Sequence, residues 1–172
     1  MILIVAACIQ KLFGSIWILR LIWKHSERPI KGESNVVRPE VIRKRMNKLD
    51  EYLSILNNLR KYSYDDFTCS PERYGSAERF LQLSIEAILD MGNHVIADSD
   101  LGIVNWYSDI PAILEKKGYL DSRLKKEWLQ MIGFRNTLVH DYVEIDRRIV
   151  YDVLQNHLKD FEEIKQVFAR FL

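Results

Sequence analysis

The chain has 172 residues, of which 48% are hydrophobic and 28% charged, and its formal net charge is +1. This length suits one domain with a sizeable core, and the charged fraction argues for a soluble globular protein. Because the net charge is so small, there is no global basic field to recruit nucleic acid. Any such contact must come from a local site or from an assembled dimer.

The two cysteines, Cys8 and Cys69, match no disulfide or metal-binding pattern. A reducing cytosol explains them most simply, so we expect a cytoplasmic protein. No spacing of His, Cys, Asp or Glu along the chain is typical of a metal site. We therefore expect neither a metal nor another cofactor.

The first 24 residues are strongly apolar, but their longest unbroken apolar run, residues 1–9, is shorter than the about 20 residues that span a bilayer. The segment also lacks the basic start and the cleavage site of a signal peptide. A marginal membrane helix stays open as an alternative, although we expect no membrane association. Residues 25–38 are polar, contain Pro29 and Gly32, and are typical of a linker.

We therefore divide the chain into an apolar segment with its linker, residues 1–36, and a helical domain, residues 37–172. The sequence from Val36 or Val37 onward resembles a natural bacterial amino terminus, and we hypothesise that the native protein starts there. The intact mass of the natively expressed protein tests this hypothesis, and a mass that includes residues 1–35 would contradict it.

Two long helices are predicted in the first half of the domain. Helical periodicity begins at Pro39 and predicts a helix over residues 39–62. Its apolar stripe consists of Ile42, Met46, Leu49, Leu53 and Leu56. The sequence Ser70-Pro71-Glu72 predicts a second helix, capped by the Ser70 hydroxyl, that runs to Ala97. Its apolar surface is wide enough for a central, buried position.

Three more helices are predicted in the second half. Ser108 or Asp109 caps a short one that ends at Gly118, and Asp121 caps the next. Asp146 opens the last one. No segment alternates with period two. The predicted fold is therefore all-α: an antiparallel bundle of four main helices plus a short one.

The apolar positions of the last two long helices are also assigned. On the helix that Asp121 caps, Trp128 and Leu129 are expected to face the core. On the last helix, one continuous stripe is expected to run from Ile149 to Phe168.

The run R-N-T-L-V-H-D-Y, residues 135–142, places an arginine, a histidine and a tyrosine close together. Arg135 can clamp a phosphate through its planar fork of donors, and His140 exchanges protons near neutral pH. Asn136 shares a helical stripe with His140, whereas Arg135 shares one with Tyr142. One cleft can therefore hold Arg135, Asn136 and His140, with Tyr142 at its edge.

These residue types suit RNA cleavage without a metal. Attack by the 2′-hydroxyl needs a base, an acid for the leaving oxygen, and a cation near the developing phosphorane charge. Each chain supplies one proton carrier, His140, and one cation, Arg135. A two-fold dimer with the cleft on its axis would supply the second proton carrier, so the chemistry favours a homodimer. The alternative is that Arg135 and His140 form a solvated face or a structural pair, and spacing alone does not decide.

The other polar residues are expected to have structural roles. His94, near the end of the second helix, is expected to satisfy local hydrogen bonds, and His157 to lie exposed on the last helix. Glu78, Glu86 and Asp90 occupy steps of eight and four on the second helix. Such residues are more typical of an ordinary polar face.

Residues 37–165 resemble the HepT-like branch of the HEPN family. The motif matches that family's pattern of Arg, a polar residue, three further residues, His, any residue and Tyr. The stretches R-K-R-M-N-K-L-D-E-Y-L-S-I-L at 43–56 and Y-G-S-A-E-R-F-L-Q-L-S-I-E-A-I-L-D-M-G-N-H-V-I-A at 74–97 resemble it too. The order of these blocks is a more specific signal than the Arg–His spacing.

This resemblance implies a helical-bundle homodimer that acts as a metal-independent ribonuclease toxin of a type VII-like toxin–antitoxin pair. Its substrate would be RNA, with tRNA suggested, and not DNA. Arg135 and His140 would be catalytic, and Asn136 would support them. The antitoxin would be an MNT-type nucleotidyltransferase that transfers AMP from its own ATP to the motif tyrosine, here Tyr142.

A second interpretation is a catalytically silent helical dimer that serves as the binding partner of a nucleotidyltransferase. Expression of the isolated helical domain separates the two hypotheses. Growth arrest is expected for a toxin, and no effect for a silent partner.

Overall fold

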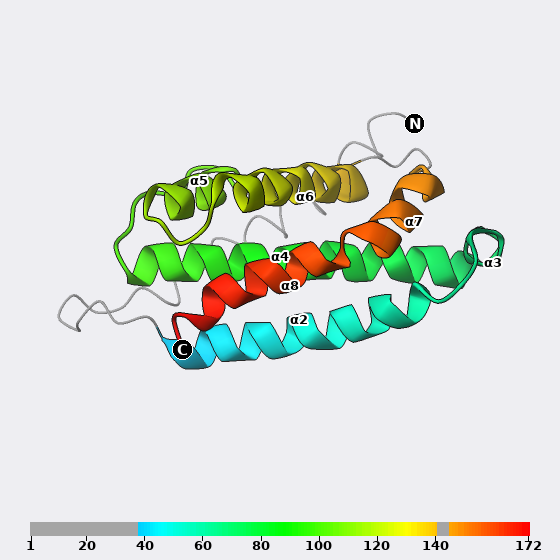
Figure 1. Cartoon of the computed structure of the whole chain (residues 1–172), viewed down its shortest axis with the longest axis horizontal. Helices are drawn as coiled ribbons and strands as arrows, with labels where there is room; N and C mark the ends of the chain where they lie inside the picture. The colour runs from blue at the N-terminus through cyan, green and yellow to red at the C-terminus, as the bar shows by residue number, and fades with distance from the viewer. Residues whose placement is uncertain (1–37, 141–144) are drawn as a thin grey trace, which may run out of the picture. The chain divides into compact units, whose positions relative to one another are not determined.

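The computed structural model describes residues 38–140 and 145–172, and all regular elements in these ranges are α-helices (Figure 1). In chain order they are α2 (Pro39–Leu59), α3 (Tyr64–Thr68), α4 (Pro71–Asp98), α5 (Asp109–Lys116), α6 (Ser122–His140), α7 (Arg147–Asn156) and α8 (Leu158–Ala169). The all-α bundle is confirmed. The apolar segment 1–36, the proposed start at Val36 or Val37, and Tyr142 lie outside the described residues.

The longest helix, α4, is the centre of the bundle. It packs against each of the other six described helices, and buried side chains recur along it from Ala77 to Ile96. Figure 1 shows α2 running antiparallel to α4 on one side and α6 on the other. The sequence prediction of a central helix is therefore confirmed, because an apolar surface this wide can be buried only by neighbours on several sides.

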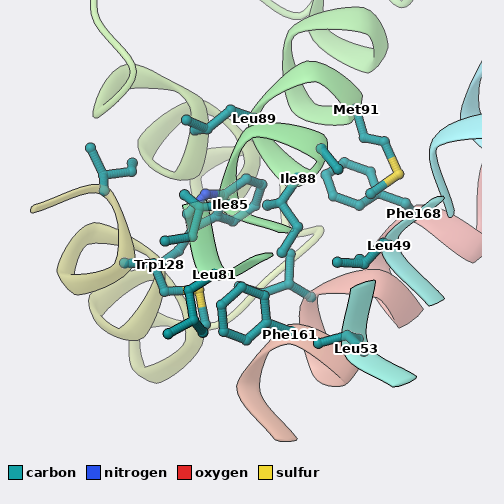
Figure 2. Close-up of a cluster of buried hydrophobic side chains, with 14 of the residues drawn as sticks. Leu49, Leu53, Leu81, Ile85, Ile88, Leu89, Met91, Trp128, Phe161 and Phe168 are labelled. Atoms are coloured by element: carbon teal, nitrogen blue, oxygen red, sulfur yellow. The ribbon is translucent and has the colours of Figure 1, made fainter. Parts of the chain in front are cut away.

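The core lies where α2, α6 and α8 meet α4. Figure 2 shows Leu49 of α2, Ile88 of α4, Trp128 of α6 and Phe161 of α8 converging there. The Trp128 ring is fully buried and meets the ring of Phe168 edge-on, with centroids 5.8 Å apart.

Leu129 corrects one prediction, because its side chain is 36% exposed. Adjacent residues on a helix point about 100° apart. Only one of the pair Trp128 and Leu129 can therefore occupy the middle of the interface, and the larger ring takes it.

Helix starts follow the predicted caps at Asp121 and Asp146, but not at α4 and α5. At α5 the Ser108 side chain makes no capping bond, and the Asp109 carboxylate accepts from N–H groups that precede the helix. Asp121 Oδ1 accepts from the Leu124 N–H at 2.7 Å, and Asp146 Oδ1 accepts from the Arg148 N–H at 2.9 Å. The Ser70 hydroxyl, however, makes no capping bond. The Ser70 carbonyl instead accepts the first N–H groups of α4, from Arg73 and Tyr74.

The predicted single last helix is two helices. The chain breaks at His157, whose φ and ψ are −117° and 1°, so α7 and α8 have different directions. The expected apolar positions are buried on both helices, at Val150, Leu154, Phe161, Ile164 and Phe168. Ile149 is the exception, because its side chain is 53% exposed. The short helix α3, begun by Ser63, was not predicted, since five residues carry no periodic signal.

None of the helices in residues 38–140 and 145–172 is both long enough and apolar enough to cross a bilayer.

Candidate active site

The motif lies in the second half of α6. Arg135 and Asn136 are in the helix, and the helical backbone extends to His140. The His140 side chain and all of Tyr142 lie outside the described part of the structure. The geometry of the site therefore begins with Arg135.

The Arg135 side chain points from α6 to α4. Its Nη2 donates a hydrogen bond to Oε1 of Glu86 at 2.9 Å. The arginine side chain is 15% exposed and the carboxylate 34%. A pair this sheltered is screened less by solvent than a surface pair, so it holds the guanidinium in a defined direction.

An aromatic ring borders the same guanidinium. The central carbon of the Arg135 guanidinium lies 5.7 Å from the ring centroid of Tyr107, in the connection between α4 and α5. This distance is within the range of a cation–π contact. Nε of Arg135 is buried and has no hydrogen-bond acceptor among the described residues. The donor fork of Arg135 is therefore only partly used within the described chain.

Glu86 is itself held by a chain of hydrogen bonds along α4. Gln82 Nε2 donates to Glu86 Oε1 at 3.0 Å, and Arg79 Nη1 donates to Gln82 Oε1 at 3.1 Å. These residues are three and four apart, the spacing at which helical side chains meet. Because the carboxylate is fixed from its own helix, it can position Arg135.

Glu78 lies one turn beyond Gln82 on the same stripe of α4. Burial raises the pKa of the Glu78 carboxyl above its ordinary value, and the nearby charge of Arg147 opposes this rise. The polar stripe of α4 therefore carries two different carboxyl groups. Glu86 is paired with Arg135, whereas burial disfavours the ionised form of Glu78.

Asn136 is exposed to solvent, next in the chain to the half-buried Arg135. It is therefore accessible to a substrate or to a second copy of the chain. The shared cleft of Arg135, Asn136 and His140 stays a prediction, because the His140 side chain is not described.

The sequence predicted an ordinary polar face for Glu86, identified no partner for it, and did not single out Tyr107. The pairing with Arg135 depends on the antiparallel register of α4 and α6, which are linked through two loops and α5. By contrast, Asp90 of the same helix pairs with Arg45 of α2 at 3.3 Å. Glu86 thus pairs with a residue of α6, and Asp90 with a residue of α2.

His94 and His157, the other histidines in the described part of the chain, have local contacts. His94 Nε2 lies 3.2 Å from Asp98 Oδ2 without hydrogen-bond geometry, a contact that is ionic only when the imidazole is protonated. His157 Nδ1 lies 3.0 Å from Oδ2 of the buried Asp160. With Glu127 of α6 these two form a group that could hold a metal ion, because their ligand atoms lie within 4.8 Å of one another. The hydrogen bond between His157 and Asp160 explains this geometry without an ion.

The fold and the motif together define a HEPN-type helical bundle: a central helix presents a carboxylate to an arginine that precedes a histidine by five residues. Residues 43–168 match the family described as Ribonuclease HepT-like, and the chain belongs to this family.

Named relatives agree with this assignment. The chain is 37% identical over 87 residues to the "mRNA nuclease HepT" of Shewanella oneidensis, a match that covers 51% of this chain and 65% of the relative. It is 30% identical over 127 residues to the "tRNA nuclease HepT" of Aphanizomenon flos-aquae, covering 73% of this chain and 85% of the relative. The chain thus spans just under two thirds of the first relative and most of the second.

Solved structures share the fold. The tri-AMPylated HEPN toxin of Shewanella oneidensis, in complex with an MNT antitoxin, superposes with a TM-score of 0.70 at 27% identity, covering 76% of this chain and 97% of that one. A toxin–antitoxin complex with AMP-PNP gives a TM-score of 0.71 at 26% identity, covering 76% and 98%. The expected HEPN-like architecture is confirmed.

Proposed function

We propose that this chain is the toxin of a type VII-like toxin–antitoxin pair and a metal-independent RNA endonuclease. The observation that carries the proposal is Arg135, held half-buried by Glu86 five residues before His140, in a chain of the HepT-like ribonuclease family. The two named relatives are described as acting on mRNA and on tRNA. We propose tRNA as the substrate, because the relative that covers more of this chain is the tRNA nuclease.

The proposed chemistry assigns one task to each residue. The guanidinium of Arg135 binds the scissile phosphate and stabilises the charge that develops on the phosphorane. His140 moves the proton between the 2′-hydroxyl, which attacks phosphorus, and the 5′-oxygen, which leaves. The exposed amide of Asn136 hydrogen-bonds the substrate beside them. The products are a 2′,3′-cyclic phosphate and a free 5′-hydroxyl.

Two proton transfers occur in this reaction, and the motif of one chain carries one histidine. We propose a homodimer in which the motifs of two chains face each other, so that each supplies a His140 to one composite site. This arrangement also gathers positive charge locally in a chain whose net charge is only +1.

The proposed partner is an MNT-type nucleotidyltransferase antitoxin, as in the related complex from Shewanella oneidensis. It would transfer AMP from ATP to Tyr142. The adenylate adds negative charge and bulk at the mouth of a site that binds phosphate, and so excludes RNA. Because RNA and ATP are both present in the cytoplasm, we propose that the pair acts there.

Two substitutions test the assignment. His140→Ala is expected to reduce RNA cleavage by about 10²- to 10⁴-fold because it removes the general acid–base group. Arg135→Lys is expected to be nearly as damaging, because an ammonium cannot reproduce the bidentate phosphate contact. Arg148→Lys, the same change at an exposed arginine of α7, is the matched control and should cleave as the wild type does.

The readout is cleavage of total tRNA in excess EDTA, with analysis of the product ends. Cyclic phosphate ends and full activity in EDTA are expected. Wild-type cleavage by either motif variant would remove the catalytic assignment. A wild-type protein that neither cleaves RNA nor arrests growth would support the silent-partner alternative instead.

A further inference from the structure

The connection between α4 and α5, residues 99–108, carries two large apolar side chains that face solvent. Ile103 is 81% exposed and Trp106 is 75% exposed, the two highest values among the large hydrophobic side chains of the described chain. Exposing most of an indole ring to water is unfavourable, and aromatic side chains are enriched at binding surfaces.

The backbone at Trp106 is nevertheless fixed. Oδ2 of Asp109, at the start of α5, accepts hydrogen bonds from the N–H groups of Asn105 at 2.9 Å and Trp106 at 2.8 Å. The Asp109 N–H in turn donates to the Trp106 carbonyl at 3.0 Å. These three bonds join both sides of the Trp106 backbone to α5, so its exposure does not come from a loose loop.

This held tryptophan is next in the chain to the residue that borders the candidate site. The ring of Tyr107 lies 5.7 Å from the guanidinium carbon of Arg135. Neighbouring Cα atoms are about 3.8 Å apart. The Trp106 backbone therefore lies one residue from the ring that borders the region where Arg135 would hold a phosphate.

We propose that Trp106 is a substrate-binding residue that stacks on an unpaired base of the RNA beside the phosphate bound by Arg135. The proposal rests on the proposed ribonuclease function and names a contact of that same site. Every base has a π-face, so an aromatic ring can bind a single-stranded segment without reading its sequence. A chain with a net charge of +1 needs such contacts, since long-range attraction to phosphate is weak.

Binding is measured with a fluorescein-labelled, mixed-sequence 2′-O-methyl 12-mer, which cannot be cleaved because its nucleophile is blocked. Trp106→Ala is expected to weaken binding by on the order of tenfold or more, the usual effect of removing one stacking residue. Trp106→Phe should recover most of the affinity. Ile103→Ala is the matched control: it removes an equally exposed side chain of the same loop that cannot stack, and should bind within about twofold of wild type.

Two further measurements sharpen the test. A probe of the same length made entirely of abasic nucleotides should bind wild-type protein more weakly, and Trp106→Ala should lose no further affinity for it. With cleavable RNA, Trp106→Ala should raise KM and leave kcat nearly unchanged, because stacking contributes equally to the bound substrate and to the transition state.

Each contrary outcome has a distinct meaning. Wild-type affinity of Trp106→Ala overturns the proposal, and so does an equal loss in Ile103→Ala, which would indicate an apolar docking surface. Dissociation of the dimer by Trp106→Ala in sedimentation would assign Trp106 to a protein interface and likewise overturn it. If wild-type protein binds the probe through Trp106 but cleaves no RNA, the ribonuclease function fails while the stacking contact stands.

Discussion

At the scale of single residues, the direction of Arg135 is set by a carboxylate on another helix. Glu86 accepts from Arg135 and from Gln82 at the same oxygen, so the guanidinium meets an acceptor that is already oriented. An arginine on an open helix face would sample many rotamers, and the loss of that freedom would oppose phosphate binding. Preorganisation by Glu86 reduces this cost before substrate arrives.

Tyr142 is predicted to be a regulatory residue and not a catalytic one. With an unperturbed pKa of about 10, a phenol is a poor acid or base at neutral pH compared with histidine. Tyr142→Phe should keep most of the ribonuclease activity and escape the antitoxin. After co-expression with the antitoxin, mass spectrometry should find AMP on the wild-type peptide and none on the variant.

The control for this experiment is Tyr64→Phe, which removes a hydroxyl from an exposed tyrosine of α3 and should remain neutralised. An unmodified Tyr142 in a neutralised complex would mean that the antitoxin inhibits by occlusion alone.

Glu78 is predicted to make stability depend on pH. Because burial raises its folded-state pKa above the ordinary 4.5, its contribution to stability is present at low pH and is lost as pH rises through the raised pKa. The difference in free energy of unfolding between Glu78→Gln and wild type should therefore move in favour of the variant when pH is raised from about 4 to about 7. Urea unfolding at both pH values measures the difference.

Glu115 provides a control of opposite sign. Hydrogen bonds from Lys125 and Ser122 lower the pKa of its carboxyl, so its contribution is present above the ordinary pKa and is lost as pH falls. Glu115→Gln should lose stability relative to wild type at neutral pH, and the difference should shrink in acid. If Glu78→Gln and Glu115→Gln shift in the same direction, the burial argument for Glu78 is wrong.

At the scale of elements, the approach of α5 to α4 depends on Gly92. A Cβ placed there would lie 2.4 Å from Cγ2 of Ile110, which is stiff because it is β-branched, and 3.4 Å from the Trp128 ring. Gly92→Ala should therefore destabilise the fold by about 1–3 kcal/mol, as overpacking commonly does.

The matched change on the same helix is Gly75→Ala, where an added Cβ meets nothing within 4 Å. Relief of the helix penalty of glycine should stabilise this variant by about 0.5–1 kcal/mol. Thermal unfolding of the two variants separates the effect of packing at Gly92 from the effect of helix propensity at Gly75. A Gly92→Ala protein as stable as wild type would show that α5 can move away at little cost.

At the scale of the whole molecule, the active species is predicted to be a dimer with a shared site. Equal mixing of His140→Ala and Arg135→Ala chains should give inactive mixed dimers, because each would contain one histidine where the proposed reaction uses two. Cleavage assays on the mixture, with sedimentation to verify exchange, measure this. Restored activity would show either that the two variant chains complement each other or that each chain carries a complete site. An active monomer would contradict the composite site.

Local sequence signals determined much of this protein. The periodicity from Pro39 and the cap at Asp146 predicted helices that the structure contains, because helix formation depends on neighbours within a few residues. The motif from Arg135 to Tyr142 predicted the family together with the stretches at 43–56 and 74–97, because the order of these blocks is specific to it.

Only the tertiary structure decided what these elements meet. The pairing of Arg135 with Glu86, the ring of Tyr107 beside it, and the exposure of Trp106 all depend on how α4, α5 and α6 pack. The break at His157 was not predicted, because no Gly or Pro lies beside it in the sequence. Contacts between residues far apart in sequence leave no periodic trace, so the partners of the candidate site became visible only when the helices were placed together.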